Sequence, residues 1–203
     1  MFITFEGGEG SGKSTQVKLL AEYFIKQGRQ VVITREPGGT ETAEQIRDML
    51  LSNANLTPAE QCFLNYAARI DHVEKLIKPA LKEGKIVISD RFFDSTFAYQ
   101  GYAQGMPKTK IRSIHKAAIG NFKPDKTIIL DVDPLLGKKR TGARGEQNHY
   151  DREKLDFHKK IRAAFLDIAK KNKRRCVVIS SADNKEKVAA NIIKAINSKS
   201  KSK

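Results

Sequence analysis

The sequence contains little that would suit a disulfide framework, a structural metal site or a membrane span. Only two cysteines, Cys62 and Cys176, occur in 203 residues, so no disulfide network and no cysteine-based metal spacing is available. The longest apolar runs, such as 127–130 and 177–179, are far shorter than the roughly 20 residues of a membrane helix. We therefore expect a protein of a reducing compartment, the cytoplasm, with no membrane partner.

Acidic and aromatic residues are also scarce. The chain has 38 Lys and Arg against 23 Asp and Glu, which gives a formal net charge of +15. Such a balance can indicate nucleic-acid binding. However, aromatic residues make up 7% of the chain and tryptophan is absent, whereas proteins that bind single strands usually offer an aromatic stacking platform. We therefore expect a solvated basic surface, arginines gathered around a small polyanion, and no nucleic-acid partner.

What the sequence does contain is an alternation of short Ile- and Val-rich runs with longer amphipathic stretches. The runs are apolar almost throughout, as in strands that are covered on both faces. The alternation predicts an α/β fold, namely a five-stranded parallel sheet with helices on both faces. The predicted strands are 2–5, 31–34, 86–89, 127–131 and 177–180. The predicted helices are 14–27, 41–51, 58–83, 95–100, 108–120, 135–139, 151–171 and 185–198.

No linker or internal repeat divides the chain, so residues 1–197 are predicted to form a single domain. Residues 198–203 alternate serine and lysine. Such a low-complexity segment cannot bury apolar surface, and we expect a disordered basic tail.

Residues 7–14 carry the strongest chemical signal. They fit the pattern G-x-x-x-x-G-K-S/T between a strand and a helix, where glycine N–H groups and the helix N-terminus can surround phosphate oxygens. Lys13 is placed to reach the outer phosphates and Ser14 to bind Mg²⁺. The alternative, a glycine-rich turn without a ligand, would need neither side chain. The predicted phosphate loop consists of Gly7, Gly8, Glu9, Gly10, Ser11, Gly12, Lys13, Ser14 and Thr15.

Charged residues follow the other predicted strands, and parallel α/β sheets bind ligands at these carboxyl ends. Asp90 fits a carboxylate that holds Mg²⁺ through water. Arg91 suits a phosphate because its planar guanidinium can bind two oxygens at once. The alternative for this pair is a surface salt bridge. We expect Asp90 and Arg91 to share one crevice with the segments 35–40, 131–134 and 181–183.

Five segments occur along the chain in a fixed order. They read FEGGEGSGKST at 5–15, TREPGGT at 34–40, YAAR at 66–69, DR with ST and AYQG within 90–101, and LDVDP at 130–134. Together they closely resemble the bacterial thymidylate kinases over nearly the whole chain. The resemblance implies an ATP-dependent kinase that converts dTMP to dTDP with Mg²⁺, for dTTP biosynthesis. It also implies a direct in-line phosphoryl transfer and a homodimer.

The resemblance assigns roles on the phosphate side of the dTMP site. Arg35 and Arg91 would bind the dTMP phosphate, and Glu9 would lie near the sugar and the acceptor phosphate. A carboxylate inside an anion-binding loop is unfavourable unless it meets a hydroxyl, a metal or an arginine. The presence of Glu9 therefore supports such a role.

Further roles concern the base and the sugar. Arg69 would hydrogen-bond the thymine edge, while Thr96 and Gln100 would line the same pocket. Tyr99 would crowd the ribose 2′ position and favour deoxynucleotides; alternatively, it is a core tyrosine.

The sequence departs from the family at the position of the aromatic residue that stacks on thymine. That position, four residues before Arg69, holds Asn65. Either Tyr66 or Phe63 substitutes for it, or the stack is lost. A related kinase for dUMP, CMP or AMP therefore remains an alternative.

A basic glycine-containing segment, about residues 137–150, resembles the family's mobile lid. Arg140 would lie over the adenine, and Arg144 would reach the transferring phosphoryl group as an arginine finger. The predicted catalytic set is Lys13, Asp90, Arg91 and Arg144. The alternative is a flexible basic loop, and a second lid arginine of many relatives is replaced by His149.

Two other classes share a phosphate loop. A switch GTPase would carry Asn-Lys-x-Asp to read guanine, but the nearest match, residues 172–175, lacks the final aspartate. An ATPase that binds nucleic acid remains the alternative suggested by the basic charge.

Overall fold

The computed structural model describes residues 1–142, 150 and 153–198. Its centre is a five-stranded sheet in the order β2-β3-β1-β4-β5, in which every neighbouring pair is parallel. The predicted fold class and the five strands are therefore confirmed, with ends that move by one residue at most. The strands are β1 (Phe2–Glu6), β2 (Val31–Arg35), β3 (Ile86–Asp90), β4 (Lys126–Asp131) and β5 (Cys176–Ser180).

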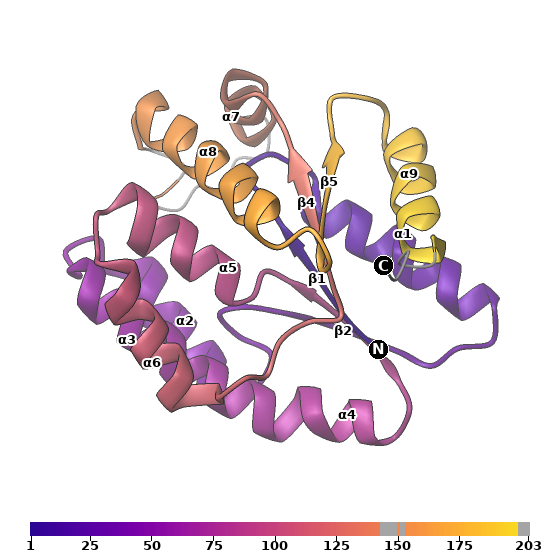
Figure 1. Cartoon of the computed structure of the whole chain (residues 1–203), viewed down its shortest axis with the longest axis horizontal. Coiled ribbons are helices and arrows are strands. Elements are labelled where there is room, and N and C mark those ends of the chain that lie inside the picture. Colours follow the sequence, from indigo (N-terminus) through magenta and orange to yellow (C-terminus); the bar gives the residue numbers. More distant parts are fainter. Residues whose placement is uncertain (143–149, 151–152, 199–203) are drawn as a thin grey trace.

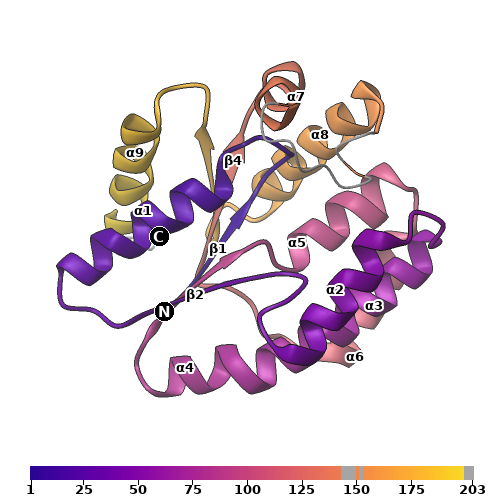
Figure 2. The same ribbon diagram turned by 180° about the vertical axis from the view of Figure 1, so that it is seen from behind.

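Helices cover both faces of this sheet (Figures 1 and 2). Helices α1 and α9 lie together on one face. The other face is covered by α4 and α8, and a group made of α2, α3 and α6 lies outside it. The helices are α1 (Lys13–Lys26), α2 (Glu41–Ser52), α3 (Pro58–His72), α4 (Lys78–Lys82), α5 (Phe93–Thr96), α6 (Lys108–Ile119), α7 (Pro134–Gly142), α8 (Leu155–Lys171) and α9 (Lys185–Asn197).

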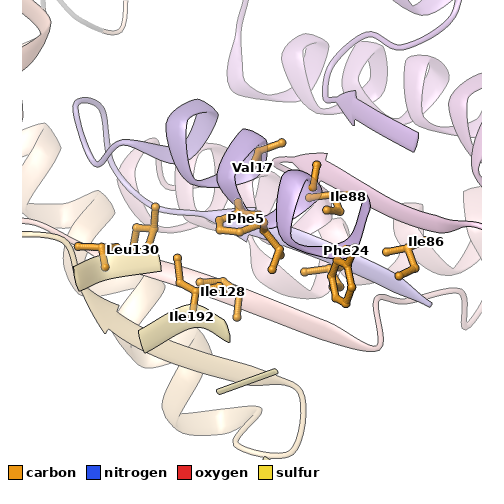
Figure 3. Packing of buried hydrophobic residues seen from close by; sticks show 12 residues of the cluster. Phe5, Val17, Phe24, Ile86, Ile88, Ile128, Leu130 and Ile192 are labelled. Carbon is orange, nitrogen blue, oxygen red and sulfur yellow. The ribbon is translucent and has the colours of Figure 1, made fainter. Parts of the chain in front are cut away.

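The main hydrophobic core lies between the sheet and the pair α1 and α9 (Figure 3). Val17, Leu20 and Phe24 form one stripe of α1, at the spacing of successive helical turns, and are buried against Phe5 of the central strand. Ile192 of α9 closes the same cluster. Each fully buried side chain of this size contributes about 1.5–3 kcal/mol, so this packing holds the strand ends, and therefore the phosphate loop, in place.

Two predicted helices contain π-helical segments. The predicted helix 58–83 is helical from Pro58 to Lys82, but Val73–Ile77, between α3 and α4, is a π-helix. The predicted short helix 95–100 begins as α5 and continues as a second π-helix, Phe97–Ala103. Such widened turns change which residues face the same way and are frequent at functional sites. The apolar periodicity of the sequence did not reveal them.

Other helix ends differ by a few residues. The prediction for 135–139 was too short, because α7 continues to Gly142 and includes the first part of the predicted lid. The helix predicted at 151–171 begins at Leu155 as α8. Residues 143–149 of the predicted lid and the tail residues 199–203 lie outside the described residues, whereas Tyr150 at the end of the lid is described. No helix in the described ranges is long and apolar enough to cross a bilayer.

Candidate active site

The carboxyl ends of β1, β2 and β3 meet at a cavity of about 270 Å³. Strand β1 lies at the centre of the sheet, where the chain order reverses, and this is where parallel α/β sheets bind ligands. The cavity brings together most of the residues predicted for the phosphate and dTMP sites. Those that line it are Glu9, Gly10, Gly12, Lys13, Ser14, Arg35, Asp90, Arg91, Thr96, Tyr99 and Gln100.

The phosphate loop connects β1 to α1 with three glycines in the left-handed backbone region. Gly7, Gly10 and Gly12 have φ values of 144°, 70° and 85°, which side chains rarely tolerate. The Lys13 ammonium donates to the carbonyls of Gly7 and Gly8, at 3.2 and 3.0 Å. Burial, reinforced by the nearby positive charge of Arg91, lowers the pKa of Lys13. The predicted loop residues Gly7, Gly8, Ser11 and Thr15 are not among those that line the cavity.

Ser14 and Asp90 are in direct contact although 76 positions separate them. The Ser14 hydroxyl donates to Asp90 Oδ2 at 2.8 Å, because α1 begins beside the end of β3. A hydroxyl next to a carboxylate, beside a phosphate loop, is the oxygen-donor set that Mg²⁺ uses when substrate phosphates supply other ligands. No group of three or more His, Cys, Asp or Glu that could hold a metal occurs in the described ranges. The pair therefore fits a metal that is shared with a nucleotide.

Arg91 is the structural centre of the site. Its backbone adopts φ 73°, the only positive φ among the described residues other than glycine, and such an outlier often marks a functional position. Its guanidinium donates to the Gly7 carbonyl at 3.1 Å, to Ser95 Oγ at 3.1 Å and to Glu9 Oε1 at 2.6 Å. Arg91 thus ties the phosphate loop to the segment that follows β3.

Glu9 faces two predicted substrate-site residues. Its Oε1 accepts from Arg91 and also from the Tyr99 hydroxyl, at 2.8 Å. Burial alone would raise the pKa of Glu9, but Arg91 and Lys13 outweigh it and lower that pKa to about 2. The carboxylate is therefore charged at neutral pH. Tyr99 was expected either to crowd the ribose 2′ position or to be a core tyrosine. It is largely buried and also lines the cavity, so its position is compatible with both.

Arg69 lies behind the cavity wall rather than on it. It is buried, and it donates from Nε to Glu36 Oε2 at 2.7 Å and from Nη2 to Thr96 Oγ1 at 3.2 Å. Both partners line the cavity, whereas Arg69 itself does not. Its Nη1 is buried and has no hydrogen-bond partner among the described residues.

Neither residue predicted to replace the stacking aromatic at Asn65 lines the cavity, whose aromatic lining residues are Tyr99 and Tyr150. Asn65 itself lines it. Tyr66 is buried against Cys62 and Ile111, with the Arg69 guanidinium 4.6 Å from its ring centre, and it is not a lining residue. Phe63 is 57% exposed and also lies outside the lining. Neither aromatic residue is placed for the predicted stack on a base in this cavity, because one is enclosed in the core and the other faces outward.

Two arginines lie at the α2 side of the cavity. Arg35, predicted to bind phosphate, pairs with Glu44 at 2.8 Å and is largely exposed. The hydrogen bond to Glu44 raises the pKa of Arg35. Arg47 also lines the cavity and donates to the Pro37 carbonyl at 2.8 Å. Sequence reasoning missed Arg47, because a single arginine on an amphipathic helix is indistinguishable from a solvated surface residue.

The segments after β4 and β5 do not reach this cavity. Arg140 of α7 donates to the Ser181 carbonyl at 2.9 Å, and the Asp131 carboxylate binds Arg162 of α8. The expected single crevice is thus divided: neither segment lines this cavity, but Asp131, Val132 and Pro134 line a second cavity together with Gly7, Gly8 and Glu9 of the phosphate loop. Arg140 lies at a neighbouring surface, and Arg144 and His149 lie outside the described residues.

These features define the class of protein. A phosphate loop at the end of the central strand, with a hydroxyl and a carboxylate joined beside it, is the arrangement of P-loop nucleotide-binding enzymes. The adjoining arginine-lined cavity provides room for a second, anionic substrate. A nucleotide phosphotransferase of the P-loop fold is the class that combines both.

Comparison with known proteins identifies the family. The family described as Thymidylate kinase matches residues 5–192. A thymidylate kinase from Wolbachia pipientis (strain wPip) is 48% identical, over 99% of this chain and 98% of that protein. One from Thermoanaerobacter sp. (strain X514) is 42% identical over 96% of each. The crystal structure of thymidylate kinase from Ehrlichia chaffeensis superposes with a TM-score of 0.79 at 41% identity, covering 97% of this chain and 98% of that one. The chain belongs to the thymidylate kinase family.

Proposed function

We propose that this protein transfers the γ-phosphoryl group of ATP to dTMP, which yields dTDP for dTTP biosynthesis. The observation that carries the proposal is the shared cavity, in which the phosphate loop and the Ser14–Asp90 pair lie next to Arg91 and Glu9. Donor phosphates and an acceptor phosphate can both reach such a site. The family matches over nearly the whole chain support the same substrate.

On the donor side, the glycine N–H groups and Lys13 bind the ATP phosphates. Ser14 and Asp90 would hold Mg²⁺, which would supply positive charge to neutralise the phosphates. Lys13 and Arg91 place positive charge around the transferring group. Direct in-line transfer needs positioning and charge stabilisation rather than a covalent enzyme intermediate.

On the acceptor side, Arg91 and Arg35 bind the dTMP phosphate. Glu9 and Tyr99 are connected to Arg91 by hydrogen bonds, so together they orient the sugar end of the nucleotide. Arg69 donates its spare guanidinium N–H groups to the base, and its Nη1, which has no hydrogen-bond partner in the described part of the chain, supports that role. Arg140 covers the adenine, and Arg144 completes the catalytic set from the lid.

A coupled assay of ADP release tests the proposal. ATP and Mg²⁺ are supplied with dTMP, dUMP, UMP, CMP, AMP or GMP in turn, and we expect a strong preference for dTMP. Preference for another monophosphate would retain the fold and mechanism but refute the assigned base. ATP hydrolysis that needs no acceptor would favour the alternative, an ATPase that binds nucleic acid.

We further propose a homodimer of cytoplasmic location. Phe63 and Ile70 lie seven residues apart, on one side of α3, and are 57% and 41% exposed. Apolar side chains grouped on a helix face commonly form interfaces. Both cysteines are free and buried, which suits a reducing compartment.

A further inference from the structure

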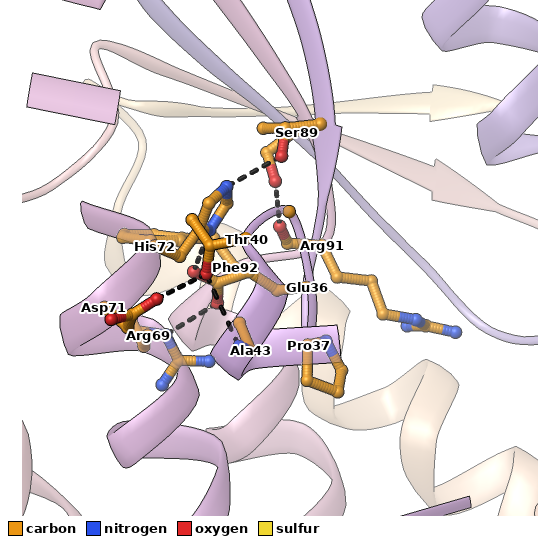
Figure 4. Close-up of polar contacts among 12 residues, drawn as sticks. Glu36, Pro37, Thr40, Ala43, Arg69, Asp71, His72, Ser89, Arg91 and Phe92 are labelled. Carbon is orange, nitrogen blue, oxygen red and sulfur yellow. Dashed lines mark hydrogen bonds and ion pairs between the residues drawn. The ribbon is translucent and has the colours of Figure 1, made fainter. Parts of the chain in front are cut away.

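A buried polar cluster of Glu36, Arg69 and His72 connects the end of β2 to α3. Its centre is the carboxylate of Glu36, which lies between Arg69 and His72 (Figure 4). Glu36 Oε2 accepts from Arg69 Nε at 2.7 Å, and Glu36 Oε1 is 3.0 Å from His72 Nδ1. All three side chains are at least 96% buried. Neither Glu36 nor His72 has a role in the donor or acceptor contacts described above.

The hydrogen-bond chemistry of this cluster allows only one arrangement at Glu36. An ionised carboxylate paired with Arg69 can only accept, so His72 Nδ1 must carry the proton that lies between them. The other ring nitrogen, Nε2, is 2.7 Å from Thr34 Oγ1 on β2. His72 therefore links the carboxylate to the sheet, and Glu36 is held from two sides.

The backbone at Gly39 packs closely against the His72 imidazole. Gly39 has φ 91°, and a Cβ atom there would overlap both Thr34 Oγ1 and His72 Nε2. The chain therefore passes directly against the imidazole and confines it between β2 and α3.

Two aromatic rings and two hydrogen bonds hold the Arg69 guanidinium in place. Its guanidinium lies 4.6 Å from the Tyr66 ring centre and 5.4 Å from that of Phe92. Burial lowers the pKa of Arg69, but the charge and hydrogen bond of Glu36, together with Tyr66 and Glu6, outweigh burial and raise that pKa. Nε and Nη2 are engaged by Glu36 and Thr96, so Nη1 alone is left as a buried donor without a partner among the described residues.

We propose that Glu36 and His72 are positioning residues that determine which pyrimidine base the enzyme accepts. They hold Arg69 so that Nη1 presents a fixed donor to a carbonyl oxygen of the base. A 4-oxo pyrimidine supplies that acceptor, whereas a 4-amino pyrimidine presents a second donor and leaves the buried Nη1 without an acceptor. This inference rests on the proposed function, in which Arg69 contacts the base.

The test compares two nucleotides that keep the methyl group, the sugar and the phosphate. They are dTMP and 5-methyl-dCMP, in which an amine replaces the 4-oxo group. The variant is Glu36→Gln, which removes the negative charge that pairs with Arg69 and replaces one acceptor oxygen of the cluster with an NH2 donor. Wild-type enzyme is assayed first, and failure to phosphorylate dTMP would refute the proposed function itself rather than the role of Glu36.

For Glu36→Gln we expect the KM for dTMP to rise about 10- to 100-fold, since a charge-assisted hydrogen bond to the base is weakened. The kcat at saturating dTMP and the KM for ATP stay near wild type. The preference for dTMP over 5-methyl-dCMP falls by a similar factor. Wild-type KM and preference in the folded variant would overturn the proposal.

Asp94→Asn is the matched control. Asp94 is 2% exposed and binds Arg175 through both carboxylate oxygens, but it does not line the cavity. This variant should lose stability without losing base preference. An equal loss of preference in Asp94→Asn and Glu36→Gln would show a general structural effect and overturn the proposal.

A second pair of variants keeps the proposal falsifiable if Glu36→Gln does not fold. His72→Gln can still donate to Glu36, whereas His72→Phe cannot. We expect base preference to fall in His72→Phe and to stay close to wild type in His72→Gln. Equal preference in the two variants, whether retained or lost, would contradict a positioning role for His72.

Discussion

At the scale of single residues, Arg91 determines how the two halves of the site meet. Its left-handed backbone turns the side chain across the loop, and its backbone N–H donates to the Phe5 carbonyl at 2.8 Å. Ser89 Oγ donates to the Arg91 carbonyl at 2.7 Å. A conformation that costs on the order of 1–3 kcal/mol persists here because neighbouring groups hold it on both sides.

Glu6 provides a residue-scale prediction about pH. It is fully buried, Oε1 accepts from the Phe92 N–H at 2.9 Å, and Oε2 is 2.6 Å from Ser95 Oγ. Burial, followed by the charge of Asp94, raises the pKa of Glu6 from 4.5 to about 8. The folded protein therefore keeps a proton that the unfolded chain loses. This proton makes stability fall as pH rises from 4.5 to 8, by at most about 1.4 kcal/mol per pH unit.

Glutamine has the donor and acceptor groups of the protonated acid, so Glu6→Gln should remove this decline while leaving stability near pH 5 similar. Urea unfolding of both proteins between pH 5 and 9 measures the difference. The gap in stability should widen in favour of the variant as pH rises. Parallel pH curves for the two proteins would show that Glu6 is ionised in the folded state.

Arg144 provides a second residue-scale prediction. If it acts as the arginine finger of the lid, Arg144→Ala should lower kcat by about 10³-fold or more, while the KM for dTMP changes little. Lys139→Ala is the control, because Lys139 is an exposed cation on α7. Steady-state kinetics with varied dTMP and ATP measure both constants. A wild-type kcat in Arg144→Ala would exclude the finger.

At the scale of elements, the phosphate loop and α7 touch through backbone. A Cβ at Gly10 would overlap the backbone of Gly137, and a Cβ at Gly137 would lie 2.5 Å from the Glu9 carbonyl oxygen. The two glycines therefore let the first turn of α7 lie directly on the loop. The sequence indicated Gly10 through its motif, but Gly137 looked like an ordinary helical glycine.

Gly137→Ala should separate α7 from the loop. We expect a loss of about 1–3 kcal/mol in the free energy of unfolding, as for other overpacked sites, together with a higher KM for ATP. Gly142→Ala is the matched control in the same helix, because its Cβ would meet no atom of the described residues within 4 Å. That control should be neutral or more stable by up to about 1 kcal/mol. Urea unfolding and ATP titration measure both; equal behaviour of the two variants would refute the contact.

The π-helical segments belong to the same scale. Val73–Ile77 follows directly after His72, and Phe97–Ala103 carries Tyr99 and Gln100. Both segments therefore adjoin residues of the dTMP side of the site. No local sequence pattern distinguishes such widened turns from α-helix.

At the scale of the whole molecule, α2 and α3 form an outer face with exposed apolar side chains. We expect the protein to be a homodimer and Phe63→Glu to shift it towards monomer, since a buried unpaired charge opposes association. Ile25→Glu on α1 is the control, because Ile25 is equally exposed, at 58% against 57%, but lies on a distant helix. Sedimentation equilibrium measures the mass. A monomeric wild-type protein, or an equal effect of both variants, would refute this interface.

The sequence by itself determined the fold class, all five strands and the phosphate loop, because these depend on local patterns. Apolar runs of strand length predict buried parallel strands, and the loop motif requires glycines, a lysine and a serine at set spacing. The resemblance to thymidylate kinases added the candidate substrate residues, most of which line one cavity.

Only the tertiary structure decided the contacts between distant segments. It joined Ser14 to Asp90, placed Arg47 at the cavity, enclosed Tyr66 in the core, and moved the ends of β4 and β5 away from the acceptor side. It also placed Glu36 between Arg69 and His72. Such contacts depend on how helices pack on the sheet, a non-local balance of burial and hydrogen bonding that no short stretch of sequence encodes.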